Sequence, residues 1–261
     1  EQTTSNTGVW QIRMFGDVSI TKDNGEPIAL RWRTAKAQQL FLYLLKHRDR
    51  LVGKPEILEW LWPDIDPSRA FPQLYTAVYH IRKTLEALDG RVLLQNKNDG
   101  YALRLKNIYL DVDAVEGFLR AGATIFEETV REFERMLDLF QDVYLSGHDY
   151  PWAENERQRY QLQWLHMKME LVKWYCGQSR WELAFKHCEQ LCQRFPLEEE
   201  VHFIYMKICD KLGLSSQVRK AYALLQSSLE RELGEKPGSE IIQWYTQWKM
   251  RKNSVQTDSG D

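Results

Sequence analysis

The chain has 261 residues, of which 43% are hydrophobic, 12% aromatic and 28% charged, a composition typical of a globular protein with one large domain or two of ordinary size. No apolar run reaches the roughly 18 residues that a transmembrane helix needs, and the N-terminus lacks the charged and apolar parts of a signal peptide. We therefore expect a cytoplasmic protein with no membrane partner, with a disordered lead or linker over residues 1–8 and a disordered tail over 251–261.

The net charge of −2 conceals an asymmetry between the two halves of the chain. Residues 1–107 carry 16 Lys and Arg against 12 Asp and Glu, whereas the rest carries 19 against 25. A basic front half and an acidic back half indicate two domains with different partners. The bias is modest and does not by itself establish binding to nucleic acid.

The chain begins with strand-like segments. Residues 9–16 and 17–21 alternate apolar and polar side chains, and an Asn-Gly turn within residues 23–26 leads to a third short segment over 27–30. Alternation around a tight turn is typical of hairpins, so these segments predict a small antiparallel sheet of three strands.

Two helices are expected next. Residues 34–47 have apolar side chains at helical spacing, with Thr34 placed to cap the first turn. Residues 53–62 have Pro55 near their start, where the missing amide donor costs nothing.

The segment over residues 73–88 predicts a third helix, with Ser68 as the cap and Pro72 in the first turn. One face is an apolar stripe, made of Leu74, Val78, Ile81 and Leu85. The opposite face carries hydrogen-bonding groups and one charge, on Gln73, Thr76, Tyr79, His80 and Lys83. Such groups suit base edges and phosphates. The alternatives are an ordinary amphipathic helix and a Tyr79 packed on the core, although His80 lies opposite Val78 and cannot join that core.

After this helix, residues 91–95 and 101–105 flank a turn sequence over 96–100, which predicts a second hairpin with Lys97 at its tip. A sheet, three helices and a final hairpin describe a winged helix, in which the third helix enters the major groove and the hairpin lies along the neighbouring backbone. Six cations are candidates for phosphate contacts, with solvated surface positions as the alternative: Arg31, Arg33, Lys36, Lys54, Arg69 and Lys97.

The back half is predicted to be helical throughout. Helices are expected over 111–122, from about 124 to 145 and over 151–176, followed by shorter helices in pairs. The spacing of five residues matches a tetratricopeptide (TPR) repeat that ends at Pro196: Leu171, Tyr175, Trp181, Ala184 and Pro196. A second unit, with Gly213 and Tyr222 at matching positions, is weaker because no Pro closes it.

Residues 9–105 resemble an OmpR-type winged helix, in the version found in the Streptomyces antibiotic regulatory protein (SARP) family. The marks are IRMFGDVSI, ALRWRTAKAQQLFLYLL, LWPD, LYTAVYHIRKTLEAL and NKNDGYALRL. The back half resembles the bacterial transcriptional activation domain of that family, through DVDAVEGFL, YPWAENERQRYQLQWL and AYALLQSSLERELGEKPGSEI. The chain departs from the family in having Thr76-Ala77 where the recognition helix often carries Thr-His.

The resemblance implies a mainly α fold with a small α+β part: a winged helix-turn-helix over 9–107, then an all-α, TPR-like activation domain over 108–250. It also implies a transcriptional activator that binds direct repeats in double-stranded promoter DNA, as a homodimer or in tandem, and contacts RNA polymerase. Such a protein is nucleoid-associated when bound to DNA. A receiver domain before residue 1, as in two-component systems, is a further expectation, because residues 1–261 contain no sensor.

The sequence carries none of the common catalytic motifs, and its six histidines are not paired with carboxylates at useful spacing. The segment HCEQLC over 187–192 is a poor metal site, because His187 and Cys188 point about 100° apart on a helix. We therefore expect no enzyme, cofactor or metal. The rival function is a TPR-type interaction scaffold or signal-sensing module whose winged helix binds protein.

Overall fold

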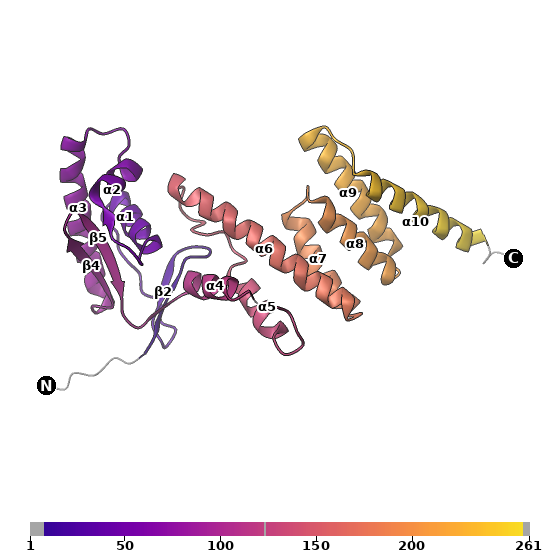
Figure 1. Cartoon of the computed structure of the whole chain (residues 1–261), viewed down its shortest axis with the longest axis horizontal. Coiled ribbons are helices and arrows are strands. Elements are labelled where there is room, and N and C mark those ends of the chain that lie inside the picture. The colour runs from indigo at the N-terminus through magenta and orange to yellow at the C-terminus, as the bar shows by residue number, and fades with distance from the viewer. Residues whose placement is uncertain (1–7, 123, 258–261) are drawn as a thin grey trace. The chain divides into compact units, whose positions relative to one another are not determined.

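The computed structural model describes residues 8–122 and 124–257 (Figure 1). Most of the predicted lead and the last four residues of the predicted tail lie outside these described residues. Within them, no helix is both long enough and apolar enough to cross a bilayer.

Contacts divide the described chain into two compact units. The first contains the chain up to residue 122 together with Asp138–Gln161. The second contains Thr124–Leu137 together with the chain from Leu162 onward. The first unit thus holds the whole winged-helix region and also the first part of the helical region that follows it.

The first sheet of the first unit contains β1 (Trp10–Arg13), β2 (Ser19–Thr21) and β6 (Ile108–Leu110), in the order β2-β1-β6. Strand β2 is antiparallel to β1, as predicted, but β6 is parallel to it. The expected third strand over 27–30 is wrong. That segment forms only an isolated bridge between Thr21 and Pro27, in which the amides of Lys22 and Ile28 donate to the carbonyl oxygens of Glu26 and Ile20, and the pairing does not continue beyond it.

Helices α1 (Ala35–Lys46) and α2 (Lys54–Leu61) begin where the sequence predicts. The Thr34 hydroxyl accepts a hydrogen bond of 3.1 Å from the amide of Ala37, which confirms the predicted cap. Pro55 lies in the first turn of α2, where its lack of an amide hydrogen is harmless. The two helices pack against α3 through a continuous core.

Helix α3 spans Pro67–Leu85 and is followed by a single 3-10 turn, Glu86–Leu88. Its cap is Asp66 and not Ser68, because the Asp66 carboxylate accepts hydrogen bonds from both the amide and the hydroxyl of Ser68. The helix therefore starts earlier than expected, and Pro72 lies inside it instead of in its first turn.

The second sheet contains β3 (Val52–Gly53), β4 (Val92–Lys97) and β5 (Gly100–Leu105), in the order β3-β5-β4. Strands β4 and β5 form the predicted hairpin, which we call the wing, with Lys97 paired to Gly100 across a turn at residues 98 and 99. Asn98 has a φ of +49°, a conformation that Asn tolerates better than most residues. Figure 1 shows the wing beside α3.

Helix α4 (Asp111–Arg120) forms where the sequence predicts a helix, directly after strand β6, which was not predicted. The long helix expected over 124–145 is wrong, because α5 covers only Val130–Leu139. The chain then leaves the helical conformation, and Phe140 and Tyr144 pack their rings 5.7 and 6.0 Å from that of Phe15. Burial of these aromatic rings against Phe15, which follows β1, outweighs the local preference for a longer helix.

Helix α6 (Pro151–Gly177) contributes its first part to the first unit and its second part to the second. Short connections join the remaining helices into hairpins: α7 (Trp181–Arg194), α8 (Glu199–Lys211), α9 (Ser215–Leu233) and α10 (Ser239–Thr257). Gly213 connects α8 to α9 with a φ of +73°, which a glycine adopts without strain. Helix α10 continues through residue 257, so the disordered tail expected from residue 251 is wrong for 251–257.

Candidate nucleic-acid interface

The two faces of α3 differ as the sequence predicts. Four apolar side chains are at most 5% exposed and pack on the core: Leu74, Val78, Ile81 and Leu85. On the opposite face, Gln73, Thr76 and Lys83 are exposed and His80 is half-buried. Tyr79 is 58% exposed, so it does not pack on the core. The helix therefore presents a continuous row of hydrogen-bonding groups to solvent.

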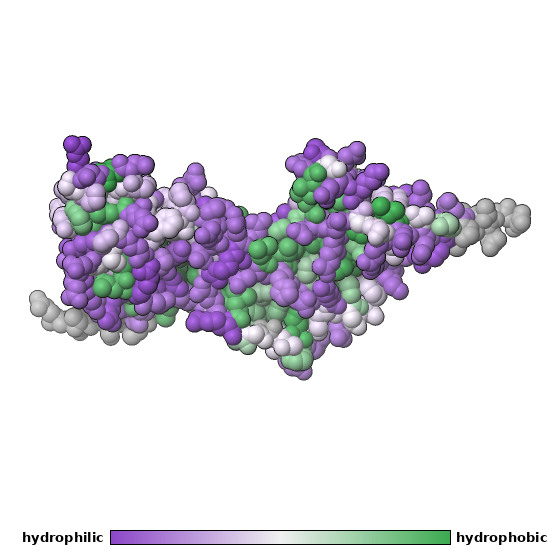
Figure 2. Space-filling view, turned by 45° about the horizontal axis from the view of Figure 1, so that its top comes forward, coloured by the Kyte–Doolittle hydropathy of each residue, from purple (hydrophilic) through white to green (hydrophobic). Residues whose placement is uncertain are grey.

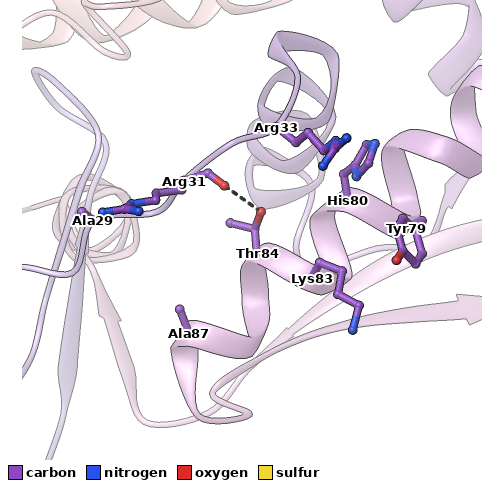
Figure 3. Close-up of a pocket in the computed structure, with 8 residues that line it drawn as sticks. All are labelled: Ala29, Arg31, Arg33, Tyr79, His80, Lys83, Thr84 and Ala87. Carbon is purple, nitrogen blue, oxygen red and sulfur yellow. Dashed lines mark hydrogen bonds between the residues drawn. The ribbon is translucent and has the colours of Figure 1, made fainter.

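A groove runs between the second half of α3 and the extended segment that precedes α1. It is a hollow of about 580 Å³ lined by Ala29, Arg31, Arg33, Tyr79, His80, Lys83, Thr84 and Ala87, and we call it the α3 groove (Figure 3). The Thr84 hydroxyl donates a hydrogen bond of 3.2 Å to the carbonyl oxygen of Arg31. This bond fixes the segment against the helix and so brings two predicted phosphate contacts beside the predicted base-reading face.

The α3 groove is electropositive. Arg31 and Arg33 are exposed, and neither forms an ion pair with another described residue. Lys83 lies 2.9 Å from the Glu86 carboxylate, and this hydrogen bond raises the pKa of Lys83. An exposed ion pair of this kind is weak, so Lys83 can leave the Glu86 carboxylate and bind another anion. The groove thus offers three cations to a phosphate backbone.

Aromatic and imidazole groups lie at the same place. Figure 3 shows the His80 ring and the Arg33 guanidinium pointing toward one another. The rings of Tyr79 and His80 meet edge to face, with their centroids 5.5 Å apart. Because Tyr79 and His80 have donors and acceptors at the tips of rigid rings, they suit groups at the floor of a nucleic-acid groove.

Gln73 and Thr76 lie on the same face of α3 but outside the α3 groove, nearer the start of the helix. The Thr76 hydroxyl donates a hydrogen bond of 2.9 Å to the carbonyl oxygen of Pro72, one turn earlier. Its hydrogen is therefore used, and its oxygen remains an acceptor. An amino group of cytosine or adenine is the matching donor in a major groove.

The other four predicted phosphate contacts are dispersed. The Lys36 ammonium donates to the carbonyl oxygen of Leu61 at the end of α2 and lies 5.7 Å from the centre of the Trp62 ring. Burial lowers the pKa of Lys36. Lys36 therefore binds a backbone carbonyl oxygen at the C-terminal end of α2, and its ammonium is less available to a phosphate than the guanidinium groups of Arg31 and Arg33.

Lys54 lies over the ring of Tyr75, 5.6 Å from its centre, and the amide of Lys54 donates to the carbonyl oxygen of Asp99 in the wing turn. Arg69 is exposed in the first turn of α3. Lys97 lines a separate hollow of about 520 Å³, together with Arg48, Arg50 and Arg104. The structure thus gathers Arg31 and Arg33 with three of the predicted base-reading residues, Tyr79, His80 and Lys83, and leaves the other predicted phosphate contacts apart.

Two residues that fit an interface were missed from the sequence. Tyr75 is 50% exposed on α3 and carries Lys54 above its ring. Arg104 points outward from β5 and donates a 3.2 Å hydrogen bond to Gln95 on β4. The alternation of β5, with Leu103 buried and its neighbour exposed, is the signal that would have identified Arg104.

Among protein families, the bacterial transcriptional activator domain matches residues 110–247 of the chain. The chain belongs to this family. The matched region covers α4 to α9 and the first part of α10, and therefore most of the helical part of the chain beyond β6.

Relatives of this family member extend the similarity over the winged helix. The chain is 25% identical to the transcriptional regulatory protein MoaR1 of Mycobacterium tuberculosis, over 92% of its own length and 79% of the relative. It is 27% identical to the regulatory protein AfsR of Streptomyces coelicolor, over 91% of this chain but only 24% of AfsR. It is 23% identical to the regulatory protein DnrI of Streptomyces peucetius, over 88% of this chain and 89% of DnrI.

Among solved structures, Mycobacterium tuberculosis EmbR, in complex with a low-affinity phosphopeptide, superimposes with a TM-score of 0.68. The identity is 22%, and the match covers 90% of this chain and 63% of the EmbR chain. This likeness confirms the predicted fold class, a small α+β part followed by a helical region. The chain is a transcription regulator of the SARP type and not an enzyme, as its sequence predicts.

Proposed function

We propose that this regulator activates transcription by binding repeated sequences in double-stranded promoter DNA and by engaging RNA polymerase. In this proposal residues 9–107 form an OmpR-type DNA-binding domain and residues 108–250 the activation domain. The observation that supports it most is the α3 groove. It places Arg31 and Arg33, which have no ion-pair partner among the described residues, beside the polar face of α3.

The two arginines would fix the position of the helix on the duplex without reading sequence, since phosphates are the same at every base pair. The base edges would be read by α3, through Thr76 as an acceptor, Lys83 as a donor, and Tyr79 and His80, which can donate or accept. The wing, which lies beside α3, would contact the neighbouring backbone through Lys97. One subunit then covers about one turn of DNA, and a homodimer or tandem pair would require two repeats.

The rival function, a winged helix that binds protein, requires a sizeable apolar surface on α3. Among the exposed residues of α3 the large apolar groups are Tyr75 and Tyr79, and both carry hydroxyl groups. On the face of the molecule in Figure 2, hydrophobic residues form small groups within a mostly hydrophilic surface. These observations favour a polar, charged partner for α3. Regulation by an upstream receiver domain is compatible with this arrangement and remains part of the proposal.

The salt dependence of DNA binding tests the role of the α3 groove. Affinity for a random-sequence duplex would be measured by fluorescence anisotropy over a range of salt concentrations, for the wild type and for Arg31→Ala/Arg33→Ala. Each lost phosphate contact reduces the slope of log affinity against log salt by about 0.9, so we expect a decrease of about 1.8.

The matched control is Lys186→Ala/Lys220→Ala, which removes two exposed cations from α7 and α9. Its slope should equal that of the wild type. Equal decreases in the two double variants, or a wild type that binds no duplex even at low salt, would contradict the proposal.

A further inference from the structure

The second unit contains a hollow of its own, of about 470 Å³, which we call the α8 hollow. Residues from α6, α7, α8 and α10 line it, so it opens among the paired helices and not at the winged helix. None of its lining residues belongs to the α3 groove. Helix α8 contributes more of the lining than any other helix.

The floor of the α8 hollow is apolar and aromatic. Trp181 at the start of α7 and Trp244 of α10 line it and are only half-buried, and Ile208 of α8 lies between the helices, 1% exposed. Trp244 is held in place by Phe203, whose ring it meets edge to face at 5.7 Å. A rigid, partly open aromatic floor of this kind suits one apolar side chain of a ligand.

Two exposed lysines line the α8 hollow beside these apolar residues. Lys207 and Lys211 are one turn apart on α8 and therefore on the same face. The Lys207 ammonium lies 3.6 Å from the centre of the Phe203 ring, and that of Lys211 lies 5.8 Å from the centre of the Trp181 ring. Neither forms an ion pair with a carboxylate of the described residues. Like charges at this spacing repel, so an anionic ligand would relieve a repulsion.

Among the described residues that line the hollow, the one carboxylate is that of Asp210, and it does not compete for these lysines. Asp210 accepts hydrogen bonds of 2.9 Å from the Trp248 indole and 3.0 Å from Lys252. Burial of its carboxyl raises the pKa of Asp210, but the hydrogen bonds from Lys252 and Trp248 outweigh burial and lower it below its usual value. Asp210 therefore stays charged and joins α8 to α10, while Lys207 and Lys211 face the hollow.

We propose that the α8 hollow binds an extended acidic peptide segment of a partner protein, with one apolar side chain between Trp181 and Trp244 and flanking carboxylates paired to Lys207 and Lys211. The volume accommodates a few residues, and the mixture of apolar floor and cationic edge fits a peptide better than a free phosphate. A nucleic acid is disfavoured, because its phosphates need cations spread along an extended surface, whereas the cations here lie around one aromatic floor.

The test uses fluorescence anisotropy with a short fluorescein-labelled peptide in which one Leu is flanked by Asp and Glu. A second peptide has Asn and Gln in place of the acids. The full chain should bind the acidic peptide at least about tenfold more tightly than the neutral one at low salt. Lys207→Glu/Lys211→Glu should weaken binding of the acidic peptide at least about tenfold, whereas Lys207→Arg/Lys211→Arg should retain it.

The matched control, Lys186→Glu/Lys220→Glu, has the same change in charge on α7 and α9 and should bind the acidic peptide as the wild type does. Circular dichroism and the thermal midpoint verify that each variant folds. The proposal is overturned if the wild type binds neither peptide, or if both charge-reversed variants lose the same affinity.

A separate arm measures duplex DNA. Lys207→Glu/Lys211→Glu should bind DNA within about twofold of the wild type. A tenfold loss of DNA affinity would show that the two lysines belong to a DNA surface and would overturn the peptide site, while leaving the assignment of α3 intact. Loss of DNA binding in Arg31→Ala/Arg33→Ala, with peptide binding retained, is the converse result that the two proposals predict together.

Discussion

Asp111 is a buried residue whose replacement should strongly reduce the free energy of unfolding of the first unit. It is 2% exposed at the first position of α4, in the segment DVDAVEGFL. Its carboxylate accepts hydrogen bonds from the amides of Met14 at 2.8 Å, Phe15 at 3.0 Å and Val112 at 2.8 Å. Two of these amides lie just after β1, so the carboxylate joins the first sheet to the start of the helical region.

Replacement of Asp111 by Ala leaves three buried amide hydrogens without this acceptor. A buried donor left unsatisfied costs about 1–3 kcal/mol, so three give about 3–9 kcal/mol before relaxation. Burial raises the pKa of Asp111, although the backbone hydrogen bonds lower it. The buried carboxylate therefore has a desolvation cost in the folded state, and Asp111→Ala removes that cost, which offsets part of the loss. We therefore expect the free energy of unfolding of the first unit to fall by about 3–5 kcal/mol.

The assay is urea unfolding of the full chain, followed by tryptophan fluorescence and circular dichroism so that separate transitions of the two units are detected. Asp113→Ala is the matched control, two residues along the same helix. Its carboxylate is 55% exposed, but the Arg48 side chain paired with it is only 8% exposed, so its loss should cost about 1–2 kcal/mol, which is still less than the loss at Asp111. If Asp111→Ala destabilises the chain no more than Asp113→Ala does, the reasoning about buried hydrogen bonds is wrong.

Two further predictions concern the same unit. Burial and the neighbouring Arg50 lower the pKa of His47 to about 4, so the unfolded state, with a pKa near 6.5, is protonated first as the pH falls. Because only the unfolded state binds this proton, the free energy of unfolding is unaffected by His47 above about pH 6.5 and decreases as the pH falls toward 4. His47→Gln should therefore make the decrease in the free energy of unfolding smaller by about 1–2 kcal/mol, after allowance for solvent screening. Urea midpoints at pH 7 and 4.5 measure this, and an unchanged pH dependence would contradict it. A Cβ on Gly100 would lie 2.4 Å from the carbonyl oxygen of Val52 on β3, so Gly100→Ala should destabilise the wing sheet by about 1–3 kcal/mol. Gly117→Ala, in open space on α4, should instead stabilise by about 0.5–1 kcal/mol, and equal urea midpoints for the two variants would refute the argument.

Local chemistry made part of the fold predictable from the sequence. The stripe that includes Leu74 and Val78 repeats at helical spacing, and the cap at Thr34 acts within one turn. The wing turn is set by Asn98, which adopts the left-handed conformation such a turn needs. Each of these signals involves residues close together in the chain, so no tertiary information is required.

The errors arose where partners are distant in sequence. Strand β6 pairs with β1 across nearly the whole winged helix, and three residues of strand pattern cannot identify such a partner. Likewise, the chain leaves the helical conformation after Leu139 because Phe140 and Tyr144 find Phe15 in the fold. The polarity of residues 251–257 predicts disorder, yet these residues extend α10.

The candidate site shows the same division. The polar face of α3 follows from helical spacing alone. The α3 groove does not, because it depends on the bond between Thr84 and the carbonyl oxygen of Arg31, which brings the segment before α1 beside the helix. The sequence also could not show that the Lys36 ammonium is occupied by the Leu61 carbonyl oxygen.

In the function proposed above, the polar face of α3 reads DNA sequence. Selection of bound sequences from a random DNA pool, with the wild type beside Thr76→Ala/His80→Ala, tests it most directly. We expect the wild type to enrich a repeated motif, and the variant to lose this motif while it retains weak, salt-sensitive binding. Enrichment of the same motif by both proteins, or of no motif by the wild type even at low salt, would contradict it.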